Sequence, residues 1–322
     1  MIGARRLVWL AVASLGLVRL ASAGHGDVPP LITEPLTIES ATLTESQFLA
    51  GDPGSPAAVG GQLRLPITPA RVPAVVLVHG ETGVAANVQQ WADVLNSIGL
   101  AVLVLDSFTA RGLAETSTDY TRLSDGSMVI DAFRALQTLA RYGKIDPRRI
   151  AVLGFSRGGT AALLTGVRRF QRAYARPGLE FAAHLALYPS CATSYRDDEQ
   201  VSARPLRVLH GTADDWMPIE PCRAYVNRLR RAGADAALVA LKGAPHLFDV
   251  ADLPSARPLP GVRRDGCLRE ERAGTLVNRA TGRPATREEC ERAGATIGHD
   301  PRAYDEAVKV VKDTLMAALG GG

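Results

Sequence analysis

Short, nearly continuous runs of apolar residues recur along the chain and alternate with segments whose apolar residues lie three or four positions apart. The short runs are typical of strands buried on both faces of a parallel sheet, and the periodic segments are typical of amphipathic helices. Predicted strands cover residues 74–79, 101–105, 150–153, 182–187, 206–209 and 236–241, and predicted helices cover 88–98, 127–142, 220–231 and 302–319. This alternation predicts an α/β fold with a mostly parallel central sheet and helices on both faces.

Two segments interrupt this rhythm. Residues 24–60 are rich in Pro, Gly, Thr and Ser, and we interpret them as an N-terminal extension with at most one edge strand. Residues 63–65 alternate between apolar and polar side chains, like another edge strand. Pro66 restricts this strand to the margin of a sheet. Residues 249–300 are charged and rich in Pro and Gly, which indicates a small excursion from a domain that otherwise covers residues 61–322.

Residues 1–23 have the three parts of a secretory signal peptide. Arg5 and Arg6 precede an apolar stretch at 7–18, and Ala-Ser-Ala at 21–23 is a sequence that signal peptidase accepts. The apolar stretch is too short to span a bilayer, so the sequence predicts an exported protein, periplasmic or extracellular, without stable membrane anchoring.

The basic net charge of +4 arises mostly from this leader. Three of the 37 Lys and Arg residues lie in it, so the remaining 34 nearly balance the 33 acidic residues. Because no basic run is interleaved with aromatic residues, nucleic acid is not an expected partner. The sequence carries no signal for an oligomeric state.

Four cysteines follow the leader, at Cys191, Cys222, Cys267 and Cys290. An even number in an exported chain predicts disulfides. Of the three possible pairings, Cys191 with Cys222 and Cys267 with Cys290 is favoured, because each pair spans a modest loop within one region of the fold. Zinc is not expected, since no C-x-x-C spacing or nearby pair of histidines supports it.

A serine flanked by glycines lies between a predicted strand and a predicted helix. The sequence GFSRG at 154–158 follows the apolar run 150–153 directly, which is the arrangement of a nucleophile elbow. The two glycines allow neighbouring backbone to pack closely around a sharp turn that exposes the serine hydroxyl. Ser156 is therefore the candidate nucleophile.

A serine hydroxyl needs a base, and the base needs an acid that orients it. After an elbow of this kind the acid precedes the histidine in the chain. Asp214 lies three residues after Gly211 at the end of a predicted strand, and we prefer it to Asp215, which we expect to cap the next helix. His246 is the one histidine that follows the acid on a loop after a strand, so it is the candidate base.

The negative charge that forms on a substrate carbonyl oxygen requires preorganised N–H donors. The backbone amide of Arg157, directly after the nucleophile, is one expected donor. The amide of Glu81, in the glycine-containing turn after the strand 74–79, is the other; alternatively the glycines there only make a turn. This chemistry requires neither a metal nor an organic cofactor.

Taken in order, these motifs resemble the dienelactone hydrolase family of the α/β-hydrolase superfamily. The resemblance rests on VHGETG at 78–83, DSFTARG at 106–112, GFSRGG at 154–159, DDW at 214–216 and GAPHLFD at 243–249. It implies hydrolysis of small-molecule esters or lactones. The family's founding members use a cysteine nucleophile and carry a pocket glutamate where Gly80 aligns, so this chain would belong to a serine-nucleophile branch.

Several residues have two interpretations at this stage. The resemblance implies that Arg111 grips a substrate carboxylate, and the alternative is an ion pair with a surface acid. Trp216, Phe108 and Phe248 either line a small acyl pocket or pack in the core. Two other functions remain open: a peptidase of the same fold, and a non-catalytic binding protein on this scaffold.

Overall fold

The predicted apolar strands form the parallel part of an eight-stranded sheet in the computed structural model, which describes residues 30–263 and 267–320. The strand order is β1-β2-β4-β3-β5-β6-β8-β9, and every neighbouring pair from β4 to β9 is parallel. The strands are β1 (Leu31–Thr42), β2 (Ser55–Pro66), β3 (Val72–Val78), β4 (Ala101–Asp106), β5 (Ile145–Phe155), β6 (His184–Leu187), β8 (Leu206–Gly211) and β9 (Ala236–Leu241). The predicted signal peptide lies outside the described residues.

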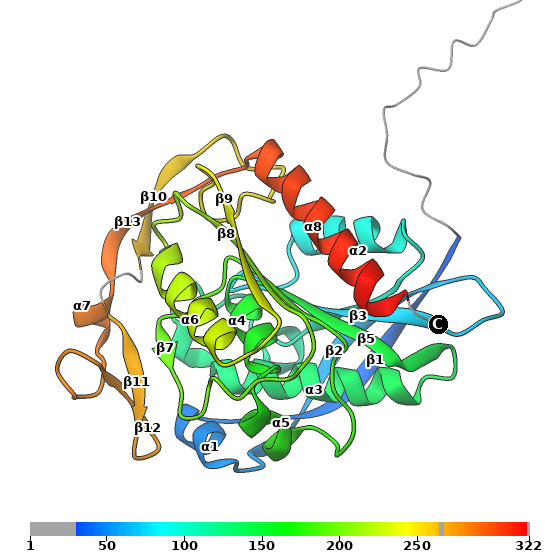
Figure 1. Ribbon diagram of the computed structural model, residues 1–322, viewed down its shortest axis with the longest axis horizontal. Coiled ribbons are helices and arrows are strands. Elements are labelled where there is room, and N and C mark those ends of the chain that lie inside the picture. The colour runs from blue at the N-terminus through cyan, green and yellow to red at the C-terminus, as the bar shows by residue number, and fades with distance from the viewer. Residues whose placement is uncertain (1–29, 264–266, 321–322) are drawn as a thin grey trace, which may run out of the picture.

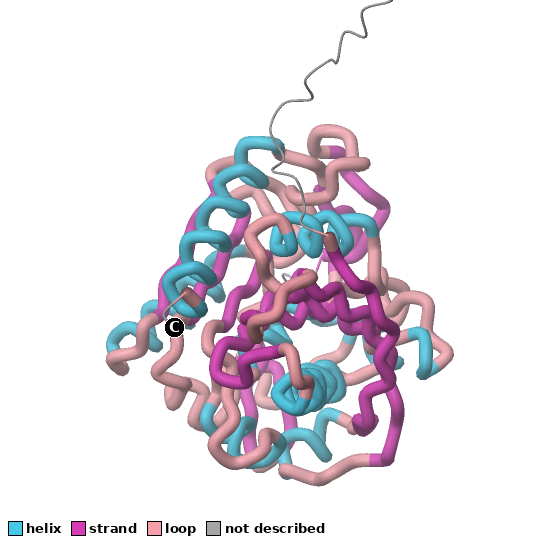
Figure 2. Tube along the Cα trace, turned by 90° about the vertical axis from the view of Figure 1, so that its right-hand side faces the viewer, coloured by secondary structure: helices cyan, strands magenta, loops and turns pink. Residues whose placement is uncertain are grey.

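Helices cover both faces of this sheet, as Figures 1 and 2 show. Successive residues of β3 alternate between the two faces: Val75 and Leu77 pack with the helices α2 and α8, whereas Val76 packs with α3. The α/β-hydrolase fold predicted from the sequence is confirmed. The helices are α1 (Glu45–Ala50), α2 (Ala86–Asn96), α3 (Asp125–Arg141), α4 (Arg157–Leu164), α5 (Arg168–Tyr174), α6 (Ile219–Arg231), α7 (Arg287–Cys290) and α8 (Pro301–Leu319), with short 3-10 turns at Thr109–Arg111 and Tyr120–Arg122.

The segment interpreted as an N-terminal extension belongs to the main sheet. β2 pairs antiparallel with β1 on one side and with β4 on the other, so residue 60 lies inside the sheet and residues 63–65 are not at its edge. The domain boundary predicted at residues 60–61 is therefore wrong. Every second side chain along these strands faces the core, as Val59, Leu63 and Leu65 do, which is the alternation of an antiparallel pair with one solvated face.

The excursion forms two small sheets beside the main one, at the left of Figure 1. β10 (Arg257–Arg263) pairs antiparallel with β13 (Arg292–Ile297). β11 (Arg269–Arg272) pairs with β12 (Thr275–Asn278) and with β7 (Thr193–Ser194), a short strand in the loop after β6. Through β7 and β13 the excursion contacts loops at the carboxyl edge of the parallel strands, where ligands bind in folds of this kind.

Both disulfides have the partners that the sequence predicts. Cys191 bonds to Cys222 and Cys267 bonds to Cys290, with no free cysteine among the described residues. The first links the loop after β6 to α6, and the second links the segment just before β11 to the last residue of α7 within the excursion. Few apolar side chains of the excursion are buried, so we expect the second disulfide to contribute much of its stability.

Replacing Cys267 and Cys290 with serine is expected to destabilise the excursion by about 3 kcal/mol, because the disulfide closes a loop of 23 residues. Limited proteolysis should then cut within residues 257–297 while the central domain stays intact. Non-reducing mass spectrometry of the parent protein should show two disulfides. An unchanged cleavage pattern, or a link from Cys191 to Cys267, would contradict this assignment.

Candidate active site

Ser156 stands at a strained turn between β5 and α4. Its backbone has φ 51° and ψ −117°, a conformation that L residues rarely adopt and that is held here by close packing. A Cβ atom on Gly154 would lie 2.0 Å from the Gly158 carbonyl oxygen, and one on Gly158 would lie 2.1 Å from the Val78 carbonyl oxygen. Only glycine fits at both positions, as the predicted elbow requires.

The three predicted polar residues meet at this turn. His246 Nε2 lies 3.1 Å from Ser156 Oγ, and His246 Nδ1 lies 2.7 Å from Asp214 Oδ2. All three residues are at most 6% exposed. With the Nδ1 proton donated to the carboxylate, Nε2 is left with a lone pair that can accept the serine proton.

Hydrogen bonds from its own loop hold Asp214 in place, and Asp215 bonds to the excursion instead of capping α6. The second oxygen of Asp214 accepts hydrogen bonds from the Trp216 and Met217 amides, at 3.1 and 2.9 Å. Asp215 accepts from the Thr296 amide at 2.7 Å and from its hydroxyl at 3.0 Å, which docks β13 of the excursion onto this loop. The expected helix cap is wrong, since α6 begins after Pro218 without a side-chain cap.

The residues that carry the two predicted oxyanion donors lie close to Ser156. Arg157 is the first residue of α4, where a backbone N–H has no partner within its helix. A Cβ atom on Gly80 would lie 3.4 Å from Ser156 Cβ, so the turn that carries Glu81 passes directly against Ser156. The Glu81 carbonyl oxygen accepts from the Thr116 amide at 2.8 Å, which fixes this turn.

The Arg157 side chain bonds to residues outside the group formed by Ser156, Asp214 and His246. Its guanidinium donates to Asp125 Oδ1 at 2.6 Å, to Thr116 Oγ1 at 3.1 Å and to the Leu123 carbonyl oxygen. It therefore ties the elbow helix to the segment before α3. The sequence motif gives no sign of this second role, because the partners lie more than thirty residues earlier in the chain.

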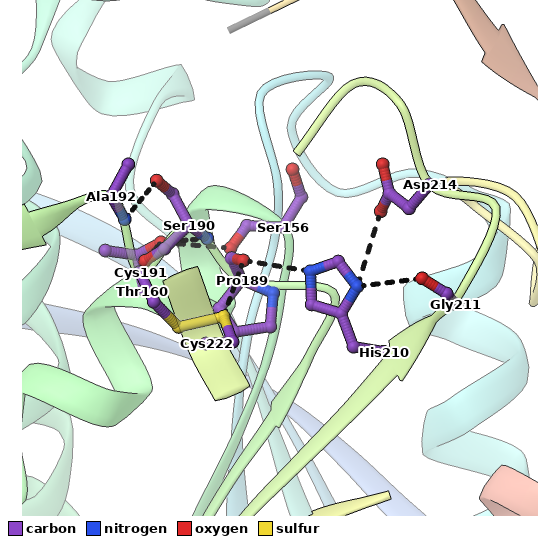
Figure 3. The surroundings of a disulfide bond; sticks show 10 residues. All are labelled: Ser156, Thr160, Pro189, Ser190, Cys191, Ala192, His210, Gly211, Asp214 and Cys222. Carbon is purple, nitrogen blue, oxygen red and sulfur yellow. Dashed lines mark hydrogen bonds and ion pairs between the residues drawn. A yellow bond between two sulfur atoms is a disulfide. The ribbon is translucent and has the colours of Figure 1, made fainter. Parts of the chain in front are cut away.

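Two further histidines lie near the site without contacting Ser156. His79 is fully buried and its Nε2 accepts a hydrogen bond from the Ser107 amide at 3.1 Å. His210 is also fully buried, with Nδ1 3.8 Å from Asp214 Oδ2 and Nε2 3.3 Å from the Pro189 carbonyl oxygen (Figure 3). Burial lowers the pKa of both imidazoles, so both are neutral at pH 7.

The Cys191–Cys222 disulfide lies beside the elbow, as Figure 3 shows. The adjacent Ser190 amide donates to Thr160 Oγ1 at 3.0 Å, and Thr160 is on the first turn of the elbow helix. The disulfide thus pins the loop after β6 to α6, and the hydrogen bond from Ser190 to Thr160 joins the same loop to α4. The cysteine spacing predicted the bond and gave no indication of this position.

Arg111 does not reach Ser156. Its guanidinium forms an ion pair with Asp131 at 2.7 and 2.9 Å, and it also donates to the backbone of Ala41 and Ser107. The side chain of Asp131 is fully buried, so neither sequence-based interpretation, a substrate carboxylate or a surface acid, describes this contact. β1, which lies in the segment interpreted as an extension with at most one edge strand, supplies Ala41 and closes the environment of Arg111.

Of the three aromatic candidates for the pocket, only Trp216 lies against the catalytic candidates. Phe108 and Phe248 are at most 1% exposed and pack against the rings of His79 and Tyr188. The Trp216 indole lies 5.3 Å from the His246 imidazole, centroid to centroid, with the rings inclined at 32°. The core-packing interpretation thus describes both phenylalanines.

A small cavity of about 70 Å³ opens beside the elbow. One part of its wall comes from the main domain, including Glu81, Arg157 and Met217. The excursion provides the rest: Cys267, Arg269, Ala285, Cys290 and Glu291.

Among the described residues, no group of three or more His, Cys, Asp or Glu side chains could hold a metal ion. In that same part of the chain, no helix is both long enough and apolar enough to cross a membrane.

The parallel sheet and the Ser156 elbow at its edge define an α/β-hydrolase. The dienelactone hydrolase family model matches residues 59–258, more than half of the chain, and the chain belongs to this family. No curated protein matches it.

Two similar structures illustrate the fold. One is a dienelactone hydrolase-like promiscuous phosphotriesterase from metagenomic libraries, which is 17% identical with a TM-score of 0.55 and covers 89% of this chain and 98% of its own. The other is esterase 2 of Thermogutta terrifontis phosphorylated by paraoxon, 18% identical with a TM-score of 0.52, covering 82% of this chain and 91% of its own. At these identities the likeness concerns the fold.

Proposed function

We propose that this protein is an exported serine hydrolase that cleaves carboxylic ester or lactone bonds of small molecules through an acyl-enzyme. The family and its esterase neighbours support a hydrolase of ester bonds. One observation carries the rest of the proposal: the hydrogen-bonded series from Asp214 through His246 to Ser156 at a strained elbow. The two disulfides are consistent with export to an oxidising compartment.

The proposed reaction has two halves. In the first, Ser156 Oγ attacks the carbonyl carbon while His246 Nε2 takes the serine proton, and Asp214 stabilises the resulting imidazolium. The amides of Arg157 and Glu81 hold the oxyanion, and collapse of the tetrahedral intermediate passes the proton to the departing alcohol. In the second half, water attacks the acyl-enzyme with His246 as base, and the acid is released.

The alternatives lack a supporting observation. Peptidases of this fold usually carry a propeller or a deep cap, and the described residues add only the small excursion to the main domain. A non-catalytic binding protein would not need the Ser156 hydroxyl within hydrogen-bond distance of a histidine that a carboxylate orients.

Organophosphate labelling tests the proposed function. A fluorophosphonate probe, or paraoxon as in the Thermogutta neighbour, should add one covalent group per chain, and the modified peptide should contain Ser156. The same preparation should hydrolyse p-nitrophenyl esters or simple lactones. Labelling at another residue, or no hydrolysis across a panel of esters and lactones, would contradict the proposal.

Short acyl chains are expected to be the better substrates. The cavity of about 70 Å³ holds only a few non-hydrogen atoms, and polar residues such as Glu81 and Arg157 contribute to its wall. We therefore expect kcat/KM for acetyl or butyryl esters to exceed that for palmitoyl esters by more than about 10-fold. Comparing these esters with and without an emulsion interface checks this, and a preference for emulsified long chains would refute it.

A further inference from the structure

Asp249 is a fully buried carboxylate only three residues after His246. Its partners are all neutral donors: Tyr188 Oη donates to Oδ1 at 2.7 Å, and Trp91 Nε1 and Asn87 Nδ2 donate to Oδ2 at 2.8 and 3.2 Å. Burial raises the pKa of Asp249, and these three hydrogen bonds oppose that shift. Burying a carboxylate without a cation costs free energy of folding, so we expect Asp249 to serve a function at this position.

Of the three donors to Asp249, Tyr188 is the one whose ring packs on the His246 imidazole. The Tyr188 ring lies 4.7 Å from the His246 ring, centroid to centroid, at an inclination of 65°. Burial raises the pKa of the Tyr188 hydroxyl well above its ordinary value, so the phenol keeps the proton that it donates to Asp249. Asp249 thereby fixes the hydroxyl end of the Tyr188 ring, and this ring packs on His246.

Backbone strain accompanies this contact. Tyr188 and Leu247 both have positive φ values, 40° and 60°, which non-glycine residues adopt only when their surroundings hold them. Asp249 is bonded to the first and lies two residues after the second. Its carboxylate therefore connects two strained segments that converge on the imidazole.

Further hydrogen bonds of this loop come from the end of the excursion. The Gly298 amide donates to the His246 carbonyl oxygen at 3.2 Å, and the Asp300 amide and His299 Nδ1 donate to the Phe248 carbonyl oxygen at 3.0 and 2.9 Å. These bonds hold the main chain of the loop. The imidazole itself packs against two rings, Tyr188 and Trp216, and of these two only Tyr188 is bonded to Asp249.

We propose that Asp249, acting through the Tyr188 ring, is a positioning residue that sets the orientation of the His246 imidazole toward Ser156. This inference rests on the proposed function, in which His246 is the base. Neither residue touches the reacting atoms. Their loss should loosen the approach of Nε2 to the serine hydroxyl and leave substrate binding in the cavity unchanged, because neither residue lines that cavity.

Three variants test the proposal: Tyr188→Phe, which keeps the ring and removes its hydroxyl, Asp249→Asn, and the double variant. Each single variant should lower kcat and the rate constant of Ser156 phosphonylation by about 10- to 100-fold, with KM nearly unchanged, because small misplacements of a catalytic group have effects of this size. The double variant should be no slower than the slower single variant, since both changes break one connection.

Tyr174→Phe is the matched control. It removes another buried phenol hydroxyl, which donates to the Phe48 carbonyl oxygen of α1 at 2.7 Å and has no bond to a residue of the site. This variant should lose thermal stability and keep kcat. If Asp249→Asn does not fold, the comparison of Tyr188→Phe with Tyr174→Phe still decides the question.

The outcomes separate the two proposals. Parent protein that is neither labelled at Ser156 nor active would refute the proposed function. Active parent protein with variants that match the Tyr174→Phe control, that change mainly KM, or whose effects multiply in the double variant would overturn the positioning role alone. A loss in kcat that is shared rather than multiplied would support it.

Discussion

Ser156→Ala is expected to lower kcat for ester hydrolysis by about four to six orders of magnitude, with the protein still folded. Without Oγ no acyl-enzyme forms, so only catalysis by the oxyanion donors acting on bound water remains. Alanine differs from serine by one oxygen atom and should tolerate the same strained turn at φ 51°. The thermal midpoint should therefore change little.

A control at another buried serine makes this result specific. Ser202→Ala removes a hydroxyl that donates to Glu180 at 3.0 Å, away from the histidine, and should keep its activity and its organophosphate labelling. Steady-state kinetics and intact-protein mass spectrometry measure both effects. Full activity in Ser156→Ala would place the nucleophile elsewhere and refute the mechanism.

The central strands could be predicted because each is buried on both faces. Strands such as β3 and β5 are apolar at consecutive positions and end at glycine-containing turns, so their place and direction follow from the sequence. β1 and the first part of β2 have one solvated face, so Thr, Glu and Pro alternate with a few buried residues such as Ile38. This weaker pattern resembled a loop, and the extent of the sheet was missed.

The contrast between strong local patterns and distant contacts also explains which parts of the candidate site could be predicted. Ser156, Asp214 and His246 each directly follow a strand or its turn, and the carboxyl ends of parallel strands meet at one edge, so local sequence brings the three together. The partners of Arg111 and Asp215 could not be predicted in this way. Asp131 and Thr296 are 20 and 81 positions away, on α3 and on β13, and only the tertiary packing of these elements brings them into contact.

The neighbouring acids Asp214 and Asp215 give the second large effect. Asp214→Asn is expected to lower kcat by about 10⁴-fold, because an amide at this position can hold His246 in the tautomer whose Nε2 carries the proton and cannot accept one. It also leaves the imidazolium without its carboxylate, which now lies 2.7 Å from Nδ1. The fold should persist, since asparagine can still accept from the Trp216 and Met217 amides.

Asp215→Asn should cost less than about 10-fold in kcat, because its carboxylate bonds to Thr296 of the excursion and not to the imidazole. The pair is a matched test, since both changes remove one negative charge from adjacent positions of one loop. The measurement is kcat for a short-chain ester under identical conditions for the parent protein and both variants. If Asp215→Asn were the more damaging change, the carboxylate that orients His246 during turnover would differ from the one bonded to it here, and the assignment of the acid would fail.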